Sequence, residues 1–274
     1  MVEPMNGAPK RIVCLTPETT EFLYRIGAAD RVVGVSSLAA PAPDGVERPV
    51  VSAFTTFRYE LIESLEPDLI LAFSDLQADA ARELGQKGYP VFLTNQRTIT
   101  ETLDTMLMLG RLVGQEEAAR ELIGELQGQL DAARNEADQY SARPVVYFEE
   151  WFDPLITGIH WAGELIEAAG GRDAFPELAK LPSATLRIVA PEAVIERQPD
   201  IIIASWCGKP VRFDHILGRP GWDRIPAIQN GALHEVDSAH CLQPGLRLFT
   251  EGLPRFQAIV RQWRKNAATA LLSG

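Results

Sequence analysis

The segment Glu60–Phe73, ELIESLEPDLILAF, and the later segment Glu192–Ser205, EAVIERQPDIIIAS, share one pattern. In each copy a helical stretch that begins with Glu is followed by Pro-Asp and then by a short apolar run. Proline ends a helix, and a short apolar run after such a stop is typical of a strand buried in a parallel sheet. The pattern therefore predicts a helix–strand unit that occurs twice, which indicates two homologous α/β lobes.

Short β-rich runs alternate with helical patterns on either side of these copies. We expect strands at Arg11–Leu15 and Arg31–Val35 with a helix at Glu18–Ile26 between them, and later a strand at Val145–Phe148 and a helix at Trp161–Ala169. Segments that alternate in this way pack as a parallel sheet with helices on both faces. Each lobe is therefore expected to be α/β, doubly wound and Rossmann-like.

Residues 98–140 interrupt this alternation. The segment contains no proline and is rich in Leu, Glu, Ala, Gln and Arg, all good helix formers. We expect one helix from 100 to about 112, a joint at Gly114 and a second helix from 115 to about 139. The predicted organisation is an N-terminal α/β lobe at 1–97, a connecting helical segment at 98–140 and a C-terminal α/β lobe at 141–274.

Composition and charge narrow the classes of partner. The chain has 274 residues, of which 46% are hydrophobic and 23% charged, and its net charge is −11. Such a composition is ordinary for a globular protein. Because nucleic-acid binding needs a basic surface, no nucleic-acid partner is expected. The chain contains no apolar run of about 18 residues, so no membrane span is expected either.

The N-terminus and the cysteines bear on the compartment. Met1–Lys10 lacks the apolar core of about 7–15 residues that a signal peptide requires, so the sequence as it stands predicts a cytoplasmic protein. A periplasmic or extracellular location is expected if a leader was removed. Cys14, Cys207 and Cys241 show no C-x-x-C spacing, which argues against a disulfide framework and a structural zinc site. A Cys207–Cys241 pair stays open.

Enzymatic motifs are missing from the sequence. It contains no G-x-x-x-x-G-K-[ST], no G-x-G-x-x-G and no G-x-S-x-G, which disfavours an ATPase, a dinucleotide enzyme and an α/β-hydrolase. We therefore predict a protein that is not an enzyme, with no catalytic residue and no required cofactor.

The order of the motifs resembles a known family. The opening Arg11–Ser36, RIVCLTPETTEFLYRIGAADRVVGVS, then LEPDLILA, the long helical segment and the repeated QPDIIIAS are similar to the substrate-binding proteins of iron-siderophore and vitamin B12 ABC importers. The resemblance covers nearly the whole chain. It implies two lobes joined by a long interdomain helix, with a corrinoid, a siderophore or another metal chelate bound in the cleft between them. It also implies an ABC permease as partner.

Candidate ligand contacts lie where the predicted strands end, because open α/β sheets bind ligands beyond the carboxyl ends of their strands. Planar macrocycles need aromatic walls and a few polar anchors. Phe54 also matches a position that is aromatic in the B12-binding members. If the strand from Val145 continues, Glu149 and Glu150 point to opposite faces, so only one faces the ligand. The predicted ligand-binding residues are Phe54, Thr55, Glu150, Trp151, His160, Trp161, Trp206 and His240.

The resemblance assigns a second role to the repeat. Glu60 and Glu192 fall where the B12-binding members carry one surface carboxylate per lobe, which docks onto arginines of the permease. The helix dipole also favours an acidic residue in a first turn, with no partner involved. Two positions depart from the B12 binders, Leu38 in place of a frequent tyrosine and His240 near an aromatic position. The general class is therefore better supported than a corrinoid ligand.

An alternative reading belongs to another class of function. A metal-binding enzyme or metallochaperone on the same fold would use His160, Glu150 and His240, since imidazole and carboxylate groups are common metal ligands. The sequence names no metal for such a site.

Overall fold

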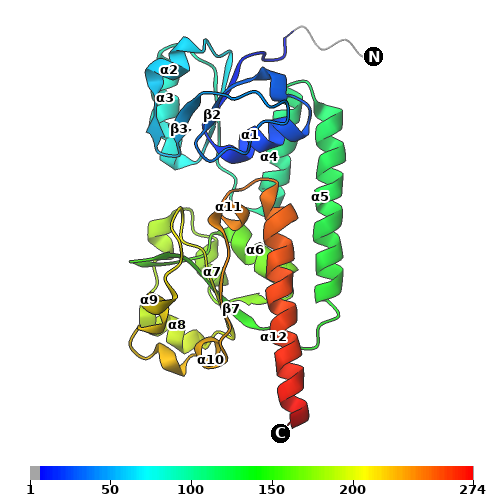
Figure 1. Ribbon diagram of the computed structural model, residues 1–274, viewed down its shortest axis with the longest axis vertical. Coiled ribbons are helices and arrows are strands. Elements are labelled where there is room, and N and C mark those ends of the chain that lie inside the picture. The colour runs from blue at the N-terminus through cyan, green and yellow to red at the C-terminus, as the bar shows by residue number, and fades with distance from the viewer. Residues whose placement is uncertain (1–6, 274) are drawn as a thin grey trace. The chain divides into compact units, whose positions relative to one another are not determined.

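The computed structural model describes residues 7–273, so most of Met1–Lys10, examined above for a signal peptide, lies outside the described residues. The chain divides into two compact units, coloured along the sequence in Figure 1. Unit 1 comprises the described residues up to Gln96 together with Thr100–Glu125, and unit 2 comprises Arg97–Ile99 and the chain from Leu126 onward. The division falls within the long helix α5 (Glu116–Ala137), in the segment expected to connect the lobes.

Unit 1 is built on a mainly parallel sheet with the strand order β4-β3-β2-β1-β5-β6. Only its edge pair β3–β4 is antiparallel within the described chain. Helices α2 and α3 cover one face, where their Ile62 and Leu84 pack on Val13 and Ile70, and Figure 1 shows α1 on the other side of the strands. The elements of unit 1 up to β6 are β1 (Ile12–Cys14), α1 (Pro17–Arg25), η1 (Ala29–Arg31), β2 (Val32–Ser36), β3 (Val50–Ala53), β4 (Thr56–Phe57), α2 (Tyr59–Ser64), β5 (Leu69–Phe73), η2 (Asp75–Gln77), α3 (Ala78–Gln86) and β6 (Val91–Thr94).

The predicted helical segment forms two helices, α4 (Ile99–Leu112) and then α5. They are joined at Gly114, whose φ of 68° lies in the left-handed region that glycine adopts readily. The two helices cross closely, because a Cβ on Gly110 would lie 2.3 Å from the Cβ of Ala119. The predicted helices and their joint are therefore confirmed.

Unit 2 contains a second sheet with the order β11-β10-β7-β8, and β9 pairs with β7 beside this path. Strands β7, β9, β10 and β11 run parallel, and β8 is antiparallel to β7. One face packs Tyr147 and Ile202 against Val194 of α8 and Ile216 of α9. The elements of unit 2 are β7 (Val145–Phe152), β8 (Leu155–Thr157), α6 (His160–Ala168), β9 (Arg172–Asp173), α7 (Pro176–Ala179), η3 (Ala184–Arg187), α8 (Pro191–Arg197), β10 (Ile201–Ala204), α9 (Phe213–Leu217), η4 (Trp222–Arg224), α10 (Pro226–Gln229), β11 (Leu233–Glu235), α11 (Ser238–Cys241), η5 (Leu248–Gly252) and α12 (Leu253–Ser273). Both units thus have the expected doubly wound α/β fold.

Strand β7 is longer than the sequence predicts. The expected strand ended at Phe148, whereas β7 continues to Phe152. The reason is the short strand β8, which pairs with the extension through Trp151–Ile156 and Phe152–Leu155 and supplies its hydrogen-bond partners. The prediction missed β8, and the hairpin carries the aromatic residues to the end of the sheet.

The internal repeat has a clear structural counterpart. Glu60 is the second residue of α2 and Glu192 the second residue of α8, and both are exposed. After each helix an aspartate anchors the start of the neighbouring strand. Asp68 accepts hydrogen bonds from the backbone N–H groups of Lys10 and Arg11, both at 2.8 Å, and Asp200 accepts one from Val145 at 2.8 Å. The matched aspartates of the repeat therefore make the same kind of contact in both units.

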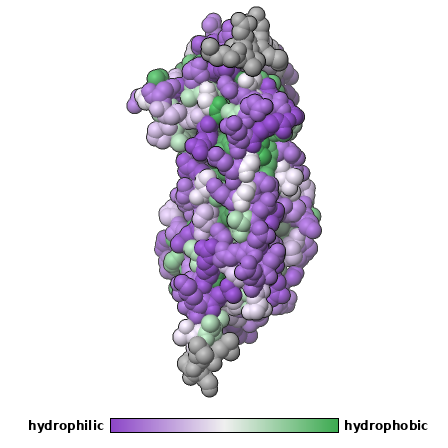
Figure 2. Space-filling model, turned by 90° about the vertical axis from the view of Figure 1, so that its right-hand side faces the viewer, coloured by the Kyte–Doolittle hydropathy of each residue, from purple (hydrophilic) through white to green (hydrophobic). Residues whose placement is uncertain are grey.

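The hydrophilic residues of the chain lie mainly on its surface. Most residues on the face drawn in Figure 2 are hydrophilic, while apolar residues of α5 such as Leu126 and Leu130 are buried. No helix among residues 7–273 combines the length and the apolar character needed to span a membrane.

Candidate functional site

Aromatic side chains gather at the carboxyl end of the sheet in unit 2. The ring of Phe152 lies 5.0 Å from Trp151 and 4.5 Å from Trp206, measured between ring centroids. His215 of α9 approaches the same group, with its ring 6.4 Å from Phe152. Trp151 and Phe152 are half-buried and keep an accessible part, whereas Trp206 is 3% exposed and forms the base. We call Trp151, Phe152, Trp206 and His215 the aromatic cluster.

The base of the cluster rests on a buried ion pair. The carboxylate of Glu149 is fully buried and binds the guanidinium of Arg219 through two hydrogen bonds of 2.5 and 2.9 Å. The indole N–H of Trp206 donates to the same carboxylate at 3.0 Å. Arg219 also stacks on Trp222, 4.4 Å from its ring centroid. Because a buried charge is costly without a partner, this geometry fixes the orientation of Trp206.

Glu150 forms the second ion pair of the edge. Its oxygens accept hydrogen bonds of 2.5 and 3.1 Å from Arg187, which is 2% exposed. Arg187 also donates to the backbone oxygen of Thr157 at the end of β8. Since β7 continues beyond Phe148, neighbouring carboxylates point to opposite faces as expected, and each meets its own arginine.

Trp161 of α6 and His240 of α11 are far apart in the sequence and differ in their surroundings. Trp161 is 2% exposed, and its indole N–H donates to the backbone oxygen of Cys241 at 2.8 Å, which places it in the core of unit 2. His240 is half-buried in the short helix α11. The Sγ of Cys241 lies 3.2 Å from the hydroxyl of Ser205, and burial raises the pKa of the Cys241 thiol to about 12. The structure holds Cys207 and Cys241 as free cysteines.

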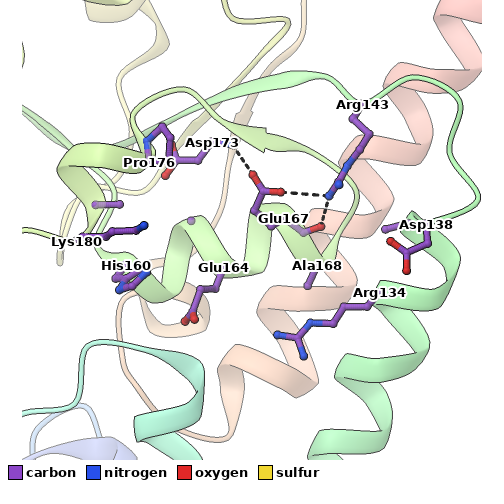
Figure 3. A pocket seen from close by; sticks show the side chains of 13 residues that line it. Arg134, Asp138, Arg143, His160, Glu164, Glu167, Ala168, Asp173, Pro176 and Lys180 are labelled. Carbon is purple, nitrogen blue, oxygen red and sulfur yellow. Dashed lines mark hydrogen bonds and ion pairs between the residues drawn. The ribbon is translucent and has the colours of Figure 1, made fainter.

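His160 lies in a separate hollow of unit 2, shown in Figure 3. The cavity has a volume of about 470 Å³ and lies between α5, α6 and α7. Arg143 binds Glu167 on one side, and a Cβ on Gly163 would come within 2.7 Å of an oxygen of Asp173. Burial raises the pKa of Asp173 to about 6. Among the described residues that line the cavity there is no member of the aromatic cluster, so His160 is not brought together with Trp151 and Trp206.

In unit 1, Phe54 and Thr55 form the turn between β3 and β4. Phe54 has a φ of 54°, a conformation that costs a residue with a side chain roughly 1–2 kcal/mol. The buried side chain of Gln77 stabilises it, because its amide donates to the Phe54 oxygen at 2.7 Å and its own oxygen accepts from the Phe73 N–H at 3.0 Å. Phe54 is half-buried and Thr55 is exposed.

A buried glutamate lies at the carboxyl end of β1. Glu18 is 6% exposed at the start of α1, and one of its oxygens has no hydrogen-bond partner within the described chain. Burial, helped by the negative charge of Glu21, raises the pKa of Glu18 to about 7. This carboxyl therefore carries a proton for part of the time near neutral pH.

The side chains proposed for the metal-enzyme alternative are not assembled. Within residues 7–273 no three His, Cys, Asp or Glu side chains are grouped so that they could hold a metal ion. Glu150 is bound to Arg187 through both oxygens, and His160 lines the separate cavity.

Sequence reasoning missed several residues of the edge. Arg219 is 70 positions from Glu149 and Arg187 is 37 positions from Glu150, so no local motif joins them. Phe152 sits next to the predicted Trp151, and extending the strand to Phe152 would have included it. His215 and Lys209 carry no sequence signal that distinguishes them from surface residues.

Comparison with known proteins identifies relatives that are similar to this chain over most of its length. The model of the family described as "Periplasmic binding protein" matches residues 12–239. A vitamin B12-binding protein of Vibrio campbellii is 28% identical over 272 residues, covering 94% of this chain and 93% of its own. An uncharacterized ABC transporter substrate-binding lipoprotein, YvrC of Bacillus subtilis, is 27% identical and covers 88% of this chain and 76% of its own.

A solved structure gives the same result. A possible iron-binding (periplasmic solute-binding) protein from Staphylococcus epidermidis superposes with a TM-score of 0.79 at 27% identity, covering 93% of this chain and 99% of that one. The family match extends over most of the sequence, from β1 to α11, and confirms the resemblance drawn from the repeated motifs. The chain belongs to the periplasmic binding protein family.

Proposed function

We propose that this protein binds a metal chelate with a planar ring, of the corrinoid or ferric type, and that it catalyses no reaction on it. The observation that carries the proposal is the aromatic cluster at the carboxyl end of the unit 2 sheet, where Trp151 and Phe152 keep accessible ring surface. Parallel sheets bind ligands at this end, and flat rings stack well on aromatic side chains. The B12-binding and iron-binding names of the two relatives support the same ligand class.

Titration of the purified chain with cyanocobalamin, haemin and a ferric siderophore tests the proposal. Trp151→Ala and Phe152→Ala each remove an aromatic wall and should weaken binding by roughly 1–3 kcal/mol, or about one to two decades in Kd. Trp263→Ala, which changes a half-buried tryptophan on α12, is the matched control and should leave the affinity unchanged. Absence of binding to both cyanocobalamin and haemin would refute the proposed ligand class, and binding of the siderophore alone, which has no planar ring, would contradict it as well.

Trp206 is a poor probe of binding. It is buried and bonded to Glu149, so Trp206→Ala removes core packing and should destabilise unit 2 by about 3–5 kcal/mol. Phe54, Thr55, His160, Trp161 and His240 stay predicted ligand contacts, and binding between the lobes stays a prediction.

We propose that Glu60 and Glu192 dock onto an ABC permease outside the cytoplasmic membrane. Their equivalent, exposed positions on α2 and α8 and the ABC transporter name of one relative support this. The double variant Glu60→Lys/Glu192→Lys should lose co-purification with the permease of the same host while it keeps ligand affinity. Glu196→Lys, on the exposed face of α8, is the control. Unchanged co-purification of the double variant would contradict the docking role, and cell fractionation checks the compartment.

A further inference from the structure

A cation without an ion-pair partner lies over two rings of the aromatic cluster. The ammonium of Lys209 lies 4.8 Å from the ring centroid of Trp151 and 5.5 Å from that of Phe152. Lys209 follows β10 in a short turn, where its backbone N–H bonds to the oxygen of Trp206 at 3.0 Å. Within the described part of the chain Lys209 forms no ion pair. The aromatic faces attract the cation but leave its charge unneutralised.

Two acidic groups of this edge are paired with arginines. Glu149 binds Arg219 and Glu150 binds Arg187, in both cases through two oxygens. Asp153 is exposed at the turn between β7 and β8 and lies beyond ion-pair distance of Lys209. In a chain whose net charge is −11, Lys209 therefore keeps an ammonium without an ion-pair partner beside the rings of Trp151 and Phe152.

Three further acids near the turn have hydrogen-bond partners of their own. Asp214 binds Arg212 at 2.7 Å, and Glu235 accepts from the backbone N–H of Val211 at 2.9 Å. Asp237 caps α11 by accepting from the N–H of Ala239 at 2.8 Å. None of them competes at ion-pair distance for Lys209 in the described residues.

We infer that the ligand of this site carries carboxylate groups at the rim of its planar ring, and that the ammonium of Lys209 binds one of them while the ring stacks on Trp151 and Phe152. The inference rests on the proposed function and narrows its ligand class. Charge-assisted hydrogen bonds to a carboxylate are about twice as strong as neutral ones, and Lys209 has no carboxylate partner of its own within the described residues. A porphyrin with propionates meets this requirement, whereas cobalamin has amides at the rim.

The experiment compares ligands that share a ring and differ in rim charge. Haemin and its neutral diamide, in which both propionates are amidated, are titrated into the full chain, with cyanocobalamin as a third ligand. The wild type should bind haemin at least about tenfold more tightly than the diamide. Lys209→Gln should weaken haemin about tenfold and leave the diamide unchanged, while Lys209→Arg should keep the preference. Lys180→Gln, at the rim of the separate cavity, is the matched control.

The outcomes separate the two proposals. Equal affinity of the wild type for haemin and the diamide, or an equal effect of Lys209→Gln on both, would overturn the role of Lys209. Tighter binding of cyanocobalamin than of haemin would overturn the inference and leave the proposed function standing. Failure to bind any of the three compounds would count against the proposed function itself. If the side chain of Lys209 instead only shields the rings of Trp151 and Phe152 in the free protein, a ligand must displace it. Lys209→Gln should then strengthen the binding of both haemin and the diamide, and this result would contradict the inference.

Discussion

Each unit buries a glutamate near the carboxyl edge of its sheet, and the two glutamates have different partners. In unit 2, Glu149 lies within β7, opposite the end of the neighbouring strand β10, and is bound by Arg219 and by the indole of Trp206. In unit 1, Glu18 follows β1 and leaves one oxygen without a hydrogen-bond partner in the described chain. Burial without a cation raises the pKa of Glu18 to about 7, because the neutral form is then easier to bury.

The contrast shows which structural features the two copies of the helix–strand unit share and which they do not. The helix, the Pro-Asp stop and the buried strand recur with the same anchoring aspartate, Asp68 or Asp200. The strand ends do not recur, since only unit 2 extends its central strand and pairs it with a hairpin partner. The repeated part therefore serves folding, and the part that differs is where ligand chemistry is expected.

The largest expected effect follows from breaking the paired glutamate of unit 2. Arg219→Met leaves the charge of Glu149 buried without its cation and should destabilise unit 2 by about 3–5 kcal/mol. Urea unfolding followed by tryptophan fluorescence measures it, because all five tryptophans belong to unit 2 and two of them contact this pair.

The double variant is the control for that loss. Glu149→Gln combined with Arg219→Met removes the unpaired charge and should recover much of the stability, as neutral replacements of buried ion pairs often do. If the double variant were as unstable as the sum of both single variants, the pair would not be coupled and the contrast with Glu18 would fail.

The unpaired glutamate of unit 1 predicts a pH effect. The folded-state pKa of Glu18 is raised to about 7 from an ordinary value of 4.5, so between these values only the folded chain keeps the proton. Stability contributed by this group is therefore present below about pH 4.5 and is lost as pH rises through 7. Glu18→Gln should remove this fall in the free energy of unfolding with pH. Relative to the wild type, the variant should therefore be about 2–3 kcal/mol better off at pH 8 than at pH 5. Parallel pH profiles of the wild type and the variant in urea unfolding would contradict it.

The sequence predicted the repeated part well and the strand ends poorly, for one physical reason. Helix stops, apolar runs and the long proline-free segment are local signals, and they predicted α2, β5, α8, β10 and the two long helices. The hairpin partner of β7 and the arginines of the buried pairs depend on contacts between distant residues. Trp151 was found because it lies beside a predicted strand end, whereas Lys209 is identified only by its position over two rings.

The smallest expected effect tests the duplicated anchor. Asp68 accepts two backbone hydrogen bonds and Asp200 accepts one. Asp68→Ala should therefore lower the free energy of unfolding by about 1–2 kcal/mol, and Asp200→Ala by about 1 kcal/mol. Because the two aspartates lie in different units, their effects should add to within about 0.5 kcal/mol. Hydrogen exchange, followed peptide by peptide, should show each loss at its own strand start, β1 or β7. Asp79→Ala, which removes an exposed carboxylate on α3, is the control and should change little. If either aspartate variant were as stable as this control, the hydrogen bonds of that aspartate would not stabilise its sheet, and the repeat would be conserved in sequence without a shared structural role.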